Sequence, residues 1–247
     1  MNLDAIATLR DSRFHLGTWL SSGSPVVAEL AGLAGFDWLL IDLEHGCGGE
    51  AALFQQLQAL RGTRSAVIVR VGAPHPDAIQ RVLDWGADGV MVPHVDTAET
   101  ARACVRCLRF PPGGTRGFSR SVRACDYGYA APVKAVQPLF FAQIESAEAV
   151  RNVASIAAVD GVDVLFVGPA DLRCDLDATP CDLDLEACLE AVAEAARSQG
   201  RQAGILNRDD AEIAPLAARG FHVQAVDSDM AILRRRQAEL VARHAQG

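Results

Sequence analysis

The stretch FDWLLIDLEHG, residues 36–46, decides the fold of this chain. Its apolar residues run almost without interruption and end abruptly in two carboxylates, an imidazole and a glycine. A strand that is buried on both faces of a parallel sheet has such a continuous apolar run, and its carboxyl end opens into a polar site. The stretch therefore predicts a buried parallel strand over 38–42, with a core strand and an ordinary polar turn as the plainer interpretation.

Seven further apolar runs have the same character, and Ala- and Leu-rich segments of helical length separate them. Ser24 and Pro25 predict the start of a helix over 26–33, because Pro is favoured at the first helical position, and Gly35 predicts its end. Ser146 predicts a cap for a helix over 147–156. This alternation of strands and helices is typical of a (β/α)8 barrel. The predicted strands cover residues 15–19, 38–42, 66–70, 89–93, 139–144, 162–167, 202–206 and 222–226.

The composition favours one domain over residues 1–247 with a small-molecule partner. Half of the 247 residues are hydrophobic, and no Gly/Ser linker divides the chain. The formal net charge of −8, without a Lys/Arg-rich patch, argues against nucleic acid and anionic membranes as partners. The first residues lack the regions of a signal peptide and no stretch reaches about 18 apolar residues, so we expect a cytoplasmic location.

The seven cysteines are an odd number and lie scattered through the chain, unlike a disulfide framework. Cys104 and Cys107 have the spacing of a metal-binding pair, but they lie in a segment predicted to be helical, 98–108. No second pair follows at zinc-finger spacing. We therefore interpret them as reduced, buried thiols.

A long irregular stretch, 111–138, precedes the predicted fifth strand. Loops of this length usually have a function or form subunit contacts. Arg116, Arg120 and Arg123 occur within it, and a solvated surface segment is the alternative interpretation. Residues 229–245 predict a final helix, on which residues 234–236, all arginine, would form a solvated face or a set of salt bridges.

Polar side chains gather at the predicted strand ends, where the active sites of such barrels form. Glu145 and Asp171 follow adjacent strands and are ligands that a hard divalent cation prefers, with helix capping as the alternative. Arg70 has a permanent charge suited to a carboxylate or a developing enolate oxygen, and a salt bridge at the barrel rim is the alternative. Imidazole titrates nearest to neutrality, so His45 is predicted to be a general base, with a structural histidine as the alternative.

The single lysine of the chain, Lys134, lies in the irregular stretch rather than in a buried strand. Because a Schiff-base mechanism needs a lysine in a desolvated pocket, carbonyl chemistry in this barrel would need a metal ion as electron sink. No G-x-G-x-x-G or P-loop motif is present, and the segments after the last two strands lack phosphate-binding glycines. Nucleotides and sugar phosphates are therefore disfavoured as ligands.

Three further polar or aromatic side chains stand at the predicted ends of strands one, four and seven: Trp19, His94 and Asn207.

Three strings are specific: DLEHG over 42–46, QIES over 143–146 and GPADL over 168–172. With GTW at 17–19, GFDW at 35–38, Arg70, LDWGA at 83–87 and the stretch 111–117, they resemble the HpcH/HpaI family of metal-dependent pyruvate aldolases. The resemblance covers essentially the whole chain. That family includes hydroxyketoheptanedioate aldolase and 2-keto-3-deoxy sugar-acid aldolases.

The resemblance implies a divalent metal ion, commonly magnesium, manganese or cobalt, held by Glu145 and Asp171 and chelated by pyruvate. It implies that His45 accepts a proton, that Arg70 stabilises the transition state and that Asp84 raises the basicity of His45. The substrate contacts that it implies are Gln143, Ala170 and Asp171, to which we add Arg70 and Trp19 at the strand ends.

Asp84 does not fit this scheme easily, because the end of the third helix should reach the opposite face of the barrel from His45. Either the helix boundary differs, or Asp84 acts across a subunit interface or through water, and Asp42 is a local alternative.

The family is typically hexameric, which implies a homo-oligomer with the final helix packed on a neighbouring subunit. The chain departs from the family at residues 173–175, Arg-Cys-Asp, and at Asp227, and both changes bear on the acceptor pocket.

The sequence thus predicts a class II aldolase that reversibly cleaves a 4-hydroxy-2-oxo acid to pyruvate and an aldehyde. Two alternatives are a lyase acting on a CoA thioester, as in citrate lyase or malyl-CoA lyase, and a non-catalytic binder of 2-oxo acids.

Overall fold

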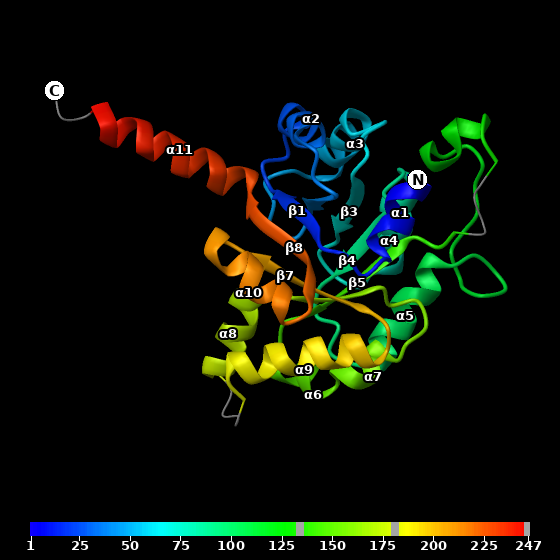
Figure 1. Ribbon diagram of the computed structural model, residues 1–247. Coiled ribbons are helices and arrows are strands. Elements are labelled where there is room, and N and C mark those ends of the chain that lie inside the picture. Colours follow the sequence, from blue (N-terminus) through cyan, green and yellow to red (C-terminus); the bar gives the residue numbers. More distant parts are fainter. Residues whose placement is uncertain (132–135, 179–182, 245–247) are drawn as a thin grey trace.

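The computed structural model describes residues 1–131, 136–178 and 183–244, and it forms a closed barrel of eight parallel strands surrounded by helices (Figure 1). Each strand pairs with the next one in sequence, and β8 pairs with β1. The predicted (β/α)8 architecture is confirmed. The strands are β1 (His15–Leu20), β2 (Trp38–Asp42), β3 (Ala66–Arg70), β4 (Gly89–Val92), β5 (Leu139–Ile144), β6 (Val164–Val167), β7 (Gln202–Asn207) and β8 (Phe221–Ser228).

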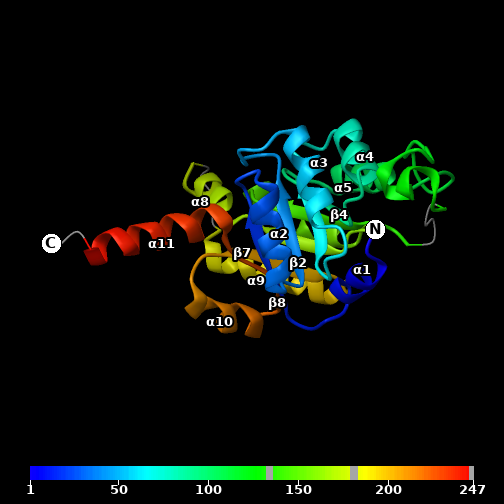
Figure 2. The ribbon, with the colours of Figure 1, turned by 90° about the horizontal axis from the view of Figure 1, so that it is seen from above.

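Helices cover the outside of the barrel between successive strands (Figures 1 and 2). The α-helices are α1 (Leu3–Leu9), α2 (Pro25–Ala34), α3 (Glu50–Ala59), α4 (Pro76–Asp84), α5 (Ala98–Leu108), α6 (Ala147–Arg151), α7 (Val153–Ala157), α8 (Pro169–Ala178), α9 (Leu185–Ser198), α10 (Ile213–Ala218) and α11 (Asp229–His244). Two 3₁₀ helices, η1 (Arg123–Gly128) and η2 (Asp210–Glu212), lie in the connections.

The predicted helix caps are present. The Ser24 side chain accepts a hydrogen bond from the backbone N–H of Val27 at the start of α2, and Gly35 ends that helix in the left-handed region with φ of 93°. The Ser146 side chain caps α6 in the same way, 3.0 Å from the backbone nitrogen of Ala149. The single helix predicted over 147–156 is wrong, because the structure has two short helices that meet at Asn152.

Two clusters of buried apolar residues hold the fold together. The larger one fills the layer between the strands and the outer helices. The smaller one fills the barrel interior, where the ring of Trp38 packs 5.4 Å from that of Phe141 and 5.8 Å from that of Phe166. Ile6 and Leu9 of α1 join this cluster and close one end of the barrel. The interior is therefore a packed core, and space for a ligand remains at the end where the strands finish.

The long connection between α5 and β5 differs from a plain surface loop. The Arg116 guanidinium is buried, with its carbon 4.7 Å from the centre of the Phe110 ring. Arg123 donates hydrogen bonds to the carbonyl oxygens of Trp85 and Leu57, at 2.6 and 2.7 Å. The solvated interpretation of these two arginines is wrong, since both fix the connection to the barrel. Lys134 lies outside the described residues.

The final helix is confirmed as α11, which leaves the barrel and extends away from it in both views (Figures 1 and 2). Arg235 forms an ion pair with Asp227, and Arg236 forms one with Glu239, as a salt-bridge set requires. The last predicted residue of this helix, Ala245, lies outside the described residues. Among the helices of the described chain, none combines the length and the apolar character needed to cross a membrane.

Candidate active site

A cavity of about 300 Å³ opens where the strands finish, a size at the lower end of the range for small-molecule sites. The parallel register places residues from distant parts of the chain around it, because Asp42 at the end of β2 lies opposite Arg70 at the end of β3. Six of the predicted site residues line the cavity: Trp19, His45, Arg70, Gln143, Ala170 and Asp171.

Arg70 and Asp42 form a buried, two-pronged ion pair in the wall of the cavity. The Arg70 Nε and Nη2 atoms donate to the two carboxylate oxygens of Asp42 at 2.9 and 2.8 Å. The Trp19 Nε1 atom also donates to Asp42, at 3.3 Å, and the Arg70 guanidinium lies 5.1 Å from the Trp19 ring centre. The alternative interpretation of Arg70 as a salt-bridge partner is confirmed, and the same side chain also lines the cavity.

The surroundings of Asp42 favour the ionised form of its carboxyl group. Burial alone would raise the pKa of this carboxyl, but the hydrogen bonds and charge of Arg70 outweigh burial and hold the pKa below its ordinary value. The backbone N–H groups of Glu44 and His45 add hydrogen bonds of 3.0 and 3.2 Å to the same carboxylate. Asp42 thus fixes the turn that follows β2, including the backbone of His45.

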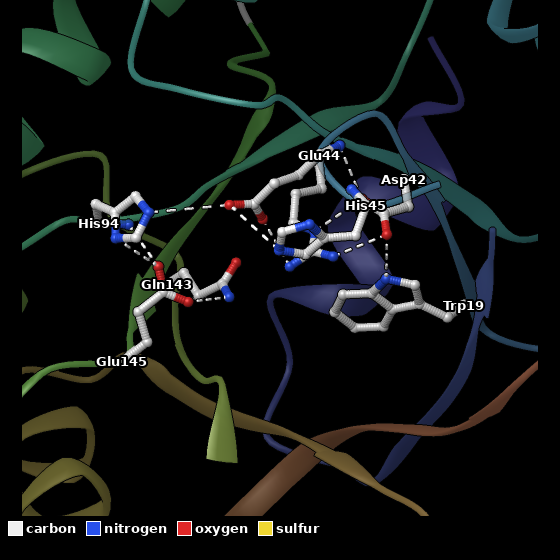
Figure 3. Close-up of polar contacts among 8 residues, drawn as sticks. Trp19, Asp42, Glu44, His45, His94, Gln143 and Glu145 are labelled. Atoms are coloured by element: carbon white, nitrogen blue, oxygen red, sulfur yellow. Dashed lines mark hydrogen bonds and ion pairs between the residues drawn. The ribbon is translucent and has the colours of Figure 1, made fainter. Parts of the chain in front are cut away.

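Glu44 is the carboxylate that approaches the His45 ring. Its Oε1 atom lies 3.8 Å from His45 Nε2 and 3.9 Å from His94 Nε2, while its Oε2 atom lies 2.8 Å from Arg70 Nη1 (Figure 3). The alternative that Asp42 orients the imidazole ring gains no support within this chain, since Asp42 accepts a hydrogen bond from the backbone of His45 and Glu44 approaches its ring. The His45 side chain is 67% exposed and is free to meet a substrate at the rim.

Glu145 is buried beside His94 and Gln143. Its Oε1 atom accepts a hydrogen bond from the His94 backbone N–H at 2.8 Å and lies 3.2 Å from His94 Nδ1, while Gln143 donates to its other oxygen. His94 has a φ of 54°, which is unusual for a residue with a side chain and which turns its backbone N–H toward this carboxylate. Gln143 is the second-last residue of β5, and its side chain lines the cavity and contacts Glu145.

The charges around Glu145 suit a bound cation. Burial raises its pKa, and the nearby carboxylates of Glu44 and Asp171 raise it further against the opposing effect of His94. In addition, the buried Gln143 Oε1 atom has no hydrogen-bond partner in the described chain. A divalent cation would relieve this crowding of negative charge, and carboxylate oxygens are the ligands that hard cations prefer. The predicted pair Glu145 and Asp171 therefore fits a metal ion.

This pair would not enclose an ion by itself. Asp171 lies in the first turn of α8 and is exposed at the cavity. Within residues 1–131, 136–178 and 183–244, no three His, Cys, Asp or Glu side chains are grouped closely enough to form a complete site. Waters or oxygens of a substrate would thus complete the coordination, as in catalytic metal sites that keep open positions.

Asp84 lies away from this cavity. It is the last residue of α4, and its carboxylate accepts a hydrogen bond of 2.9 Å from the buried Arg116. It lines a separate hollow together with Trp85, Arg123 and Tyr127. The helix boundary was predicted correctly, and the structure does not bring Asp84 to His45 within one chain.

Glu44 and His94 are residues of the site to which no role could be assigned from the sequence. Both stand at predicted strand ends, which is the signal that marked them as polar residues of the site. Their partners depend on side-chain geometry, and in the case of His94 on a left-handed backbone conformation, neither of which a strand pattern reveals.

Comparisons with known proteins place the chain in a family. The sequence profile of the family described as HpcH/HpaI aldolase/citrate lyase matches residues 15–235. A 2-dehydro-3,6-dideoxy-6-sulfogluconate aldolase of Pseudomonas putida is 40% identical over 92% of this chain and 91% of its own length. A 4-hydroxy-2-oxovalerate aldolase of Novosphingobium aromaticivorans is 43% identical over 83% of this chain and 80% of its own.

A solved structure extends the likeness to three dimensions. A HpcH/HpaI aldolase/citrate lyase family protein from Burkholderia cenocepacia J2315 superposes with a TM-score of 0.90 at 36% identity, over 98% of this chain and all of the other. The fold and the cavity thus belong to a barrel enzyme of the carbon–carbon lyase class. The chain belongs to the HpcH/HpaI aldolase/citrate lyase family, and the predicted aldolase class is confirmed.

Proposed function

We propose that this chain is a class II aldolase that reversibly cleaves a 4-hydroxy-2-oxo acid into pyruvate and an aldehyde. The observation that supports the proposal is that Asp171, Arg70 and His45 line one cavity whose described lining contains no lysine. Glu145 lies directly behind this lining, where Gln143 donates a hydrogen bond to it. The named substrate of the Novosphingobium relative is a 4-hydroxy-2-oxo acid, which supports the same reaction class here.

Glu145 and Asp171 would hold the divalent metal ion, with magnesium, manganese and cobalt as the candidates. When bound, such an ion supplies a Lewis acid that polarises the keto group of the substrate. The two carboxylates differ in their surroundings, since Glu145 is buried and hydrogen-bonded by His94 while Asp171 is exposed at the cavity. Glu145 would therefore fix the position of the site, and Asp171 would leave it open to the substrate.

Arg70 would stabilise the negative charge that develops on the substrate oxygen as the C3–C4 bond breaks. Asp42 and Glu44 orient its guanidinium from two sides, so the orientation exists before the substrate arrives. Gln143, Ala170, Asp171 and Trp19, which also line the cavity, are the proposed substrate contacts.

His45 is the proposed proton acceptor. Cleavage requires removal of the proton from the C4 hydroxyl group, and the reverse reaction requires removal of a proton from the methyl group of pyruvate. The ring stands at the rim with Glu44 beside it. Asp84 would raise the basicity of His45 only from a neighbouring subunit, because it lies in a separate hollow of its own chain.

A homo-oligomer, a hexamer as in the family, is part of this proposal. The helix α11 extends from the barrel (Figure 2). It exposes a set of large apolar side chains to solvent. Contact with a second copy would cover them. These side chains are Met230, Ile232, Leu233, Leu240 and Val241. The remaining partners that we propose are small molecules in the cytoplasm rather than nucleic acid or membranes, in keeping with the net charge of −8.

Metal removal tests the proposed function. The purified enzyme is treated with EDTA, and pyruvate release from 4-hydroxy-2-oxovalerate is followed before and after addition of Mg²⁺ or Mn²⁺. We expect a loss of about 100-fold or more on chelation, because several kcal/mol of charge stabilisation disappear, and recovery when the metal is restored. A Glu145→Gln variant should not recover. Undiminished release by the chelated enzyme would contradict the mechanism, and cleavage of a CoA ester in preference to the free acid would favour the thioester alternative.

A further inference from the structure

Arg208 is a second arginine at the cavity, and the reaction proposed above gives it no role. It follows directly after β7 and lines the cavity together with Arg70. Its side chain is exposed at the rim. Of the residues that line the cavity, these two arginines are the ones with a permanent positive charge.

The two arginines differ in how their charge is balanced. Arg70 is neutralised by Asp42 and Glu44, at distances of 2.8 Å each. No residue of the described chain forms a hydrogen bond or an ion pair with the Arg208 guanidinium, although Asp171 lines the same cavity. The charge of Arg208 therefore has no counter-charge in the described chain, whereas Arg70 already has two carboxylate partners that fix its orientation.

The closed barrel places Arg208 across the mouth of the cavity from Arg70. Strand order runs continuously from β1 to β8, so β7 is the strand opposite β3. On the side of Arg208, the cavity lining includes the apolar side chains of Leu206 on β7 and Phe166 on β6 and the hydroxyl-bearing Ser228 on β8. A substrate whose reacting carbons lie near Arg70 would thus direct its far end toward Arg208.

The backbone at Arg208 is fixed on both sides. The Asn207 Oδ1 atom accepts a hydrogen bond from the Asp209 backbone N–H at 2.9 Å, and Asp209 in turn caps η2 through the Ala211 N–H at 2.9 Å. Asn207 is itself buried beside Gln224. The Cα atom of Arg208 is therefore held at the rim while its long side chain is free to reach a ligand.

We propose that Arg208 binds an anionic group, a carboxylate or a sulfonate, at the far end of the aldehyde fragment. The enzyme then prefers acceptor aldehydes that carry a second negative charge, and Arg208 is the residue that determines this specificity. This inference rests on the proposed aldolase function of the same cavity. The rival role for Arg208, binding the carboxylate of pyruvate itself, predicts a different kinetic pattern.

The test compares two aldehydes of equal chain length, 4-oxobutanoate and butanal, as acceptors with pyruvate. Wild-type enzyme should have a higher kcat/KM for the anionic aldehyde. Arg208→Gln should lower kcat/KM for 4-oxobutanoate by about 10- to 100-fold, the range expected for a charge-assisted hydrogen bond, and should change butanal by less than about twofold. The KM for pyruvate should stay the same, and Arg208→Lys should retain part of the preference because it keeps the charge.

A matched control and an independent half-reaction separate the possible failures. Arg64→Gln removes one exposed positive charge just before the start of β3, at the end of the barrel away from the cavity, and should leave both aldehydes unaffected. Equal losses for both aldehydes, a raised KM for pyruvate or no loss at all in Arg208→Gln would overturn the role of Arg208. Exchange of the pyruvate methyl protons with D₂O reports the donor half alone. If the wild type neither exchanges these protons nor condenses pyruvate with either aldehyde, the proposed aldolase function is wrong and this inference is wrong with it. If the wild type exchanges the protons but does not prefer the anionic aldehyde, only this inference is wrong.

Discussion

The orientation of Arg70 depends on Asp42, and this dependence can be tested by replacing a single charge. Asp42→Asn keeps the size of the side chain but leaves the guanidinium, which is 7% exposed, with Glu44 as its remaining counter-charge. Breaking one side of a buried pair costs about 3 kcal/mol of stability, measured by urea unfolding. Misplacement of Arg70 should also lower kcat/KM by about 100-fold.

The control for this substitution is an exposed pair. Asp160 is 86% exposed and pairs with Arg109 at 2.8 Å, so Asp160→Asn should change stability by less than about 1 kcal/mol and leave kcat/KM unchanged. A loss of activity in Asp42→Asn no greater than in this control would show that Arg70 does not need Asp42.

The same pair has a pH signature whose sign follows from the lowered pKa of Asp42. Although burial opposes ionisation, Arg70 holds the pKa of the folded state below the ordinary value of 3.8. The stabilisation is therefore fully present above pH 3.8 and is lost as the pH falls through the lower folded-state pKa. The stability difference between wild type and Asp42→Asn should be constant above about pH 5 and should shrink on acidification below 3.8.

At the residue scale, the sequence was sufficient to identify the charged residues of the site but not to predict which of them contact each other. Asp42, Arg70 and Gln143 could be placed together because each lies at the end of a strand of one barrel or one residue before it. The contacts of Glu44 with Arg70 and of His94 with Glu145 depend on side-chain rotamers and on the φ of 54° at His94. Such local conformations are set by tertiary packing, which a pattern of apolar residues does not describe.

The turn after β2 is the element that carries His45, and Gly46 allows it to close. A Cβ atom at this position would lie 2.2 Å from the carbonyl oxygen of Asp42, a backbone atom that cannot move aside. Gly46→Ala should therefore distort the turn and cost about 1–3 kcal/mol, with a fall in kcat because His45 and the Asp42 carboxylate shift together. Thermal unfolding and steady-state kinetics measure the two effects.

Gly49, three residues further on, provides the comparison. A Cβ atom there meets nothing within 4 Å, so Gly49→Ala should cost no more than about 1 kcal/mol through the cap of α3, with activity retained. If both alanine variants behave alike, the close approach at Gly46 does not control the site.

The type and order of the elements could be predicted, whereas some of their ends could not. Val162 is apolar and buried, yet β6 begins at Val164 because the pairing with Phe141 of β5 begins there. The break between α6 and α7 lies at Asn152, whose side chain donates a hydrogen bond of 2.8 Å to the Asp96 carbonyl. Both ends are set by contacts with other elements, so composition alone does not reveal them.

At the scale of the whole molecule, α11 is the element on which the proposed assembly depends. Its side chains Leu233, Leu240 and Val241 are 45, 43 and 66% exposed in the single chain, although they share one face of the helix by their spacing. The sequence predicts the helix, and the structure shows that it extends away from its own barrel (Figure 1). The apolar face is therefore uncovered in the single chain.

A charge on this face tests whether a second copy covers it. Leu240→Glu should dissociate the oligomer, as measured by sedimentation velocity, because an unpaired carboxylate would be buried at the contact. Ala242→Glu adds the same charge on the opposite side of α11 by helical spacing and should leave the assembly intact. If Asp84 reaches His45 only from a neighbouring subunit, kcat should fall along with dissociation in Leu240→Glu and should recover at protein concentrations that restore the oligomer. A dissociated variant with full activity would instead leave Glu44, 3.8 Å from the His45 ring, as the carboxylate that orients this base.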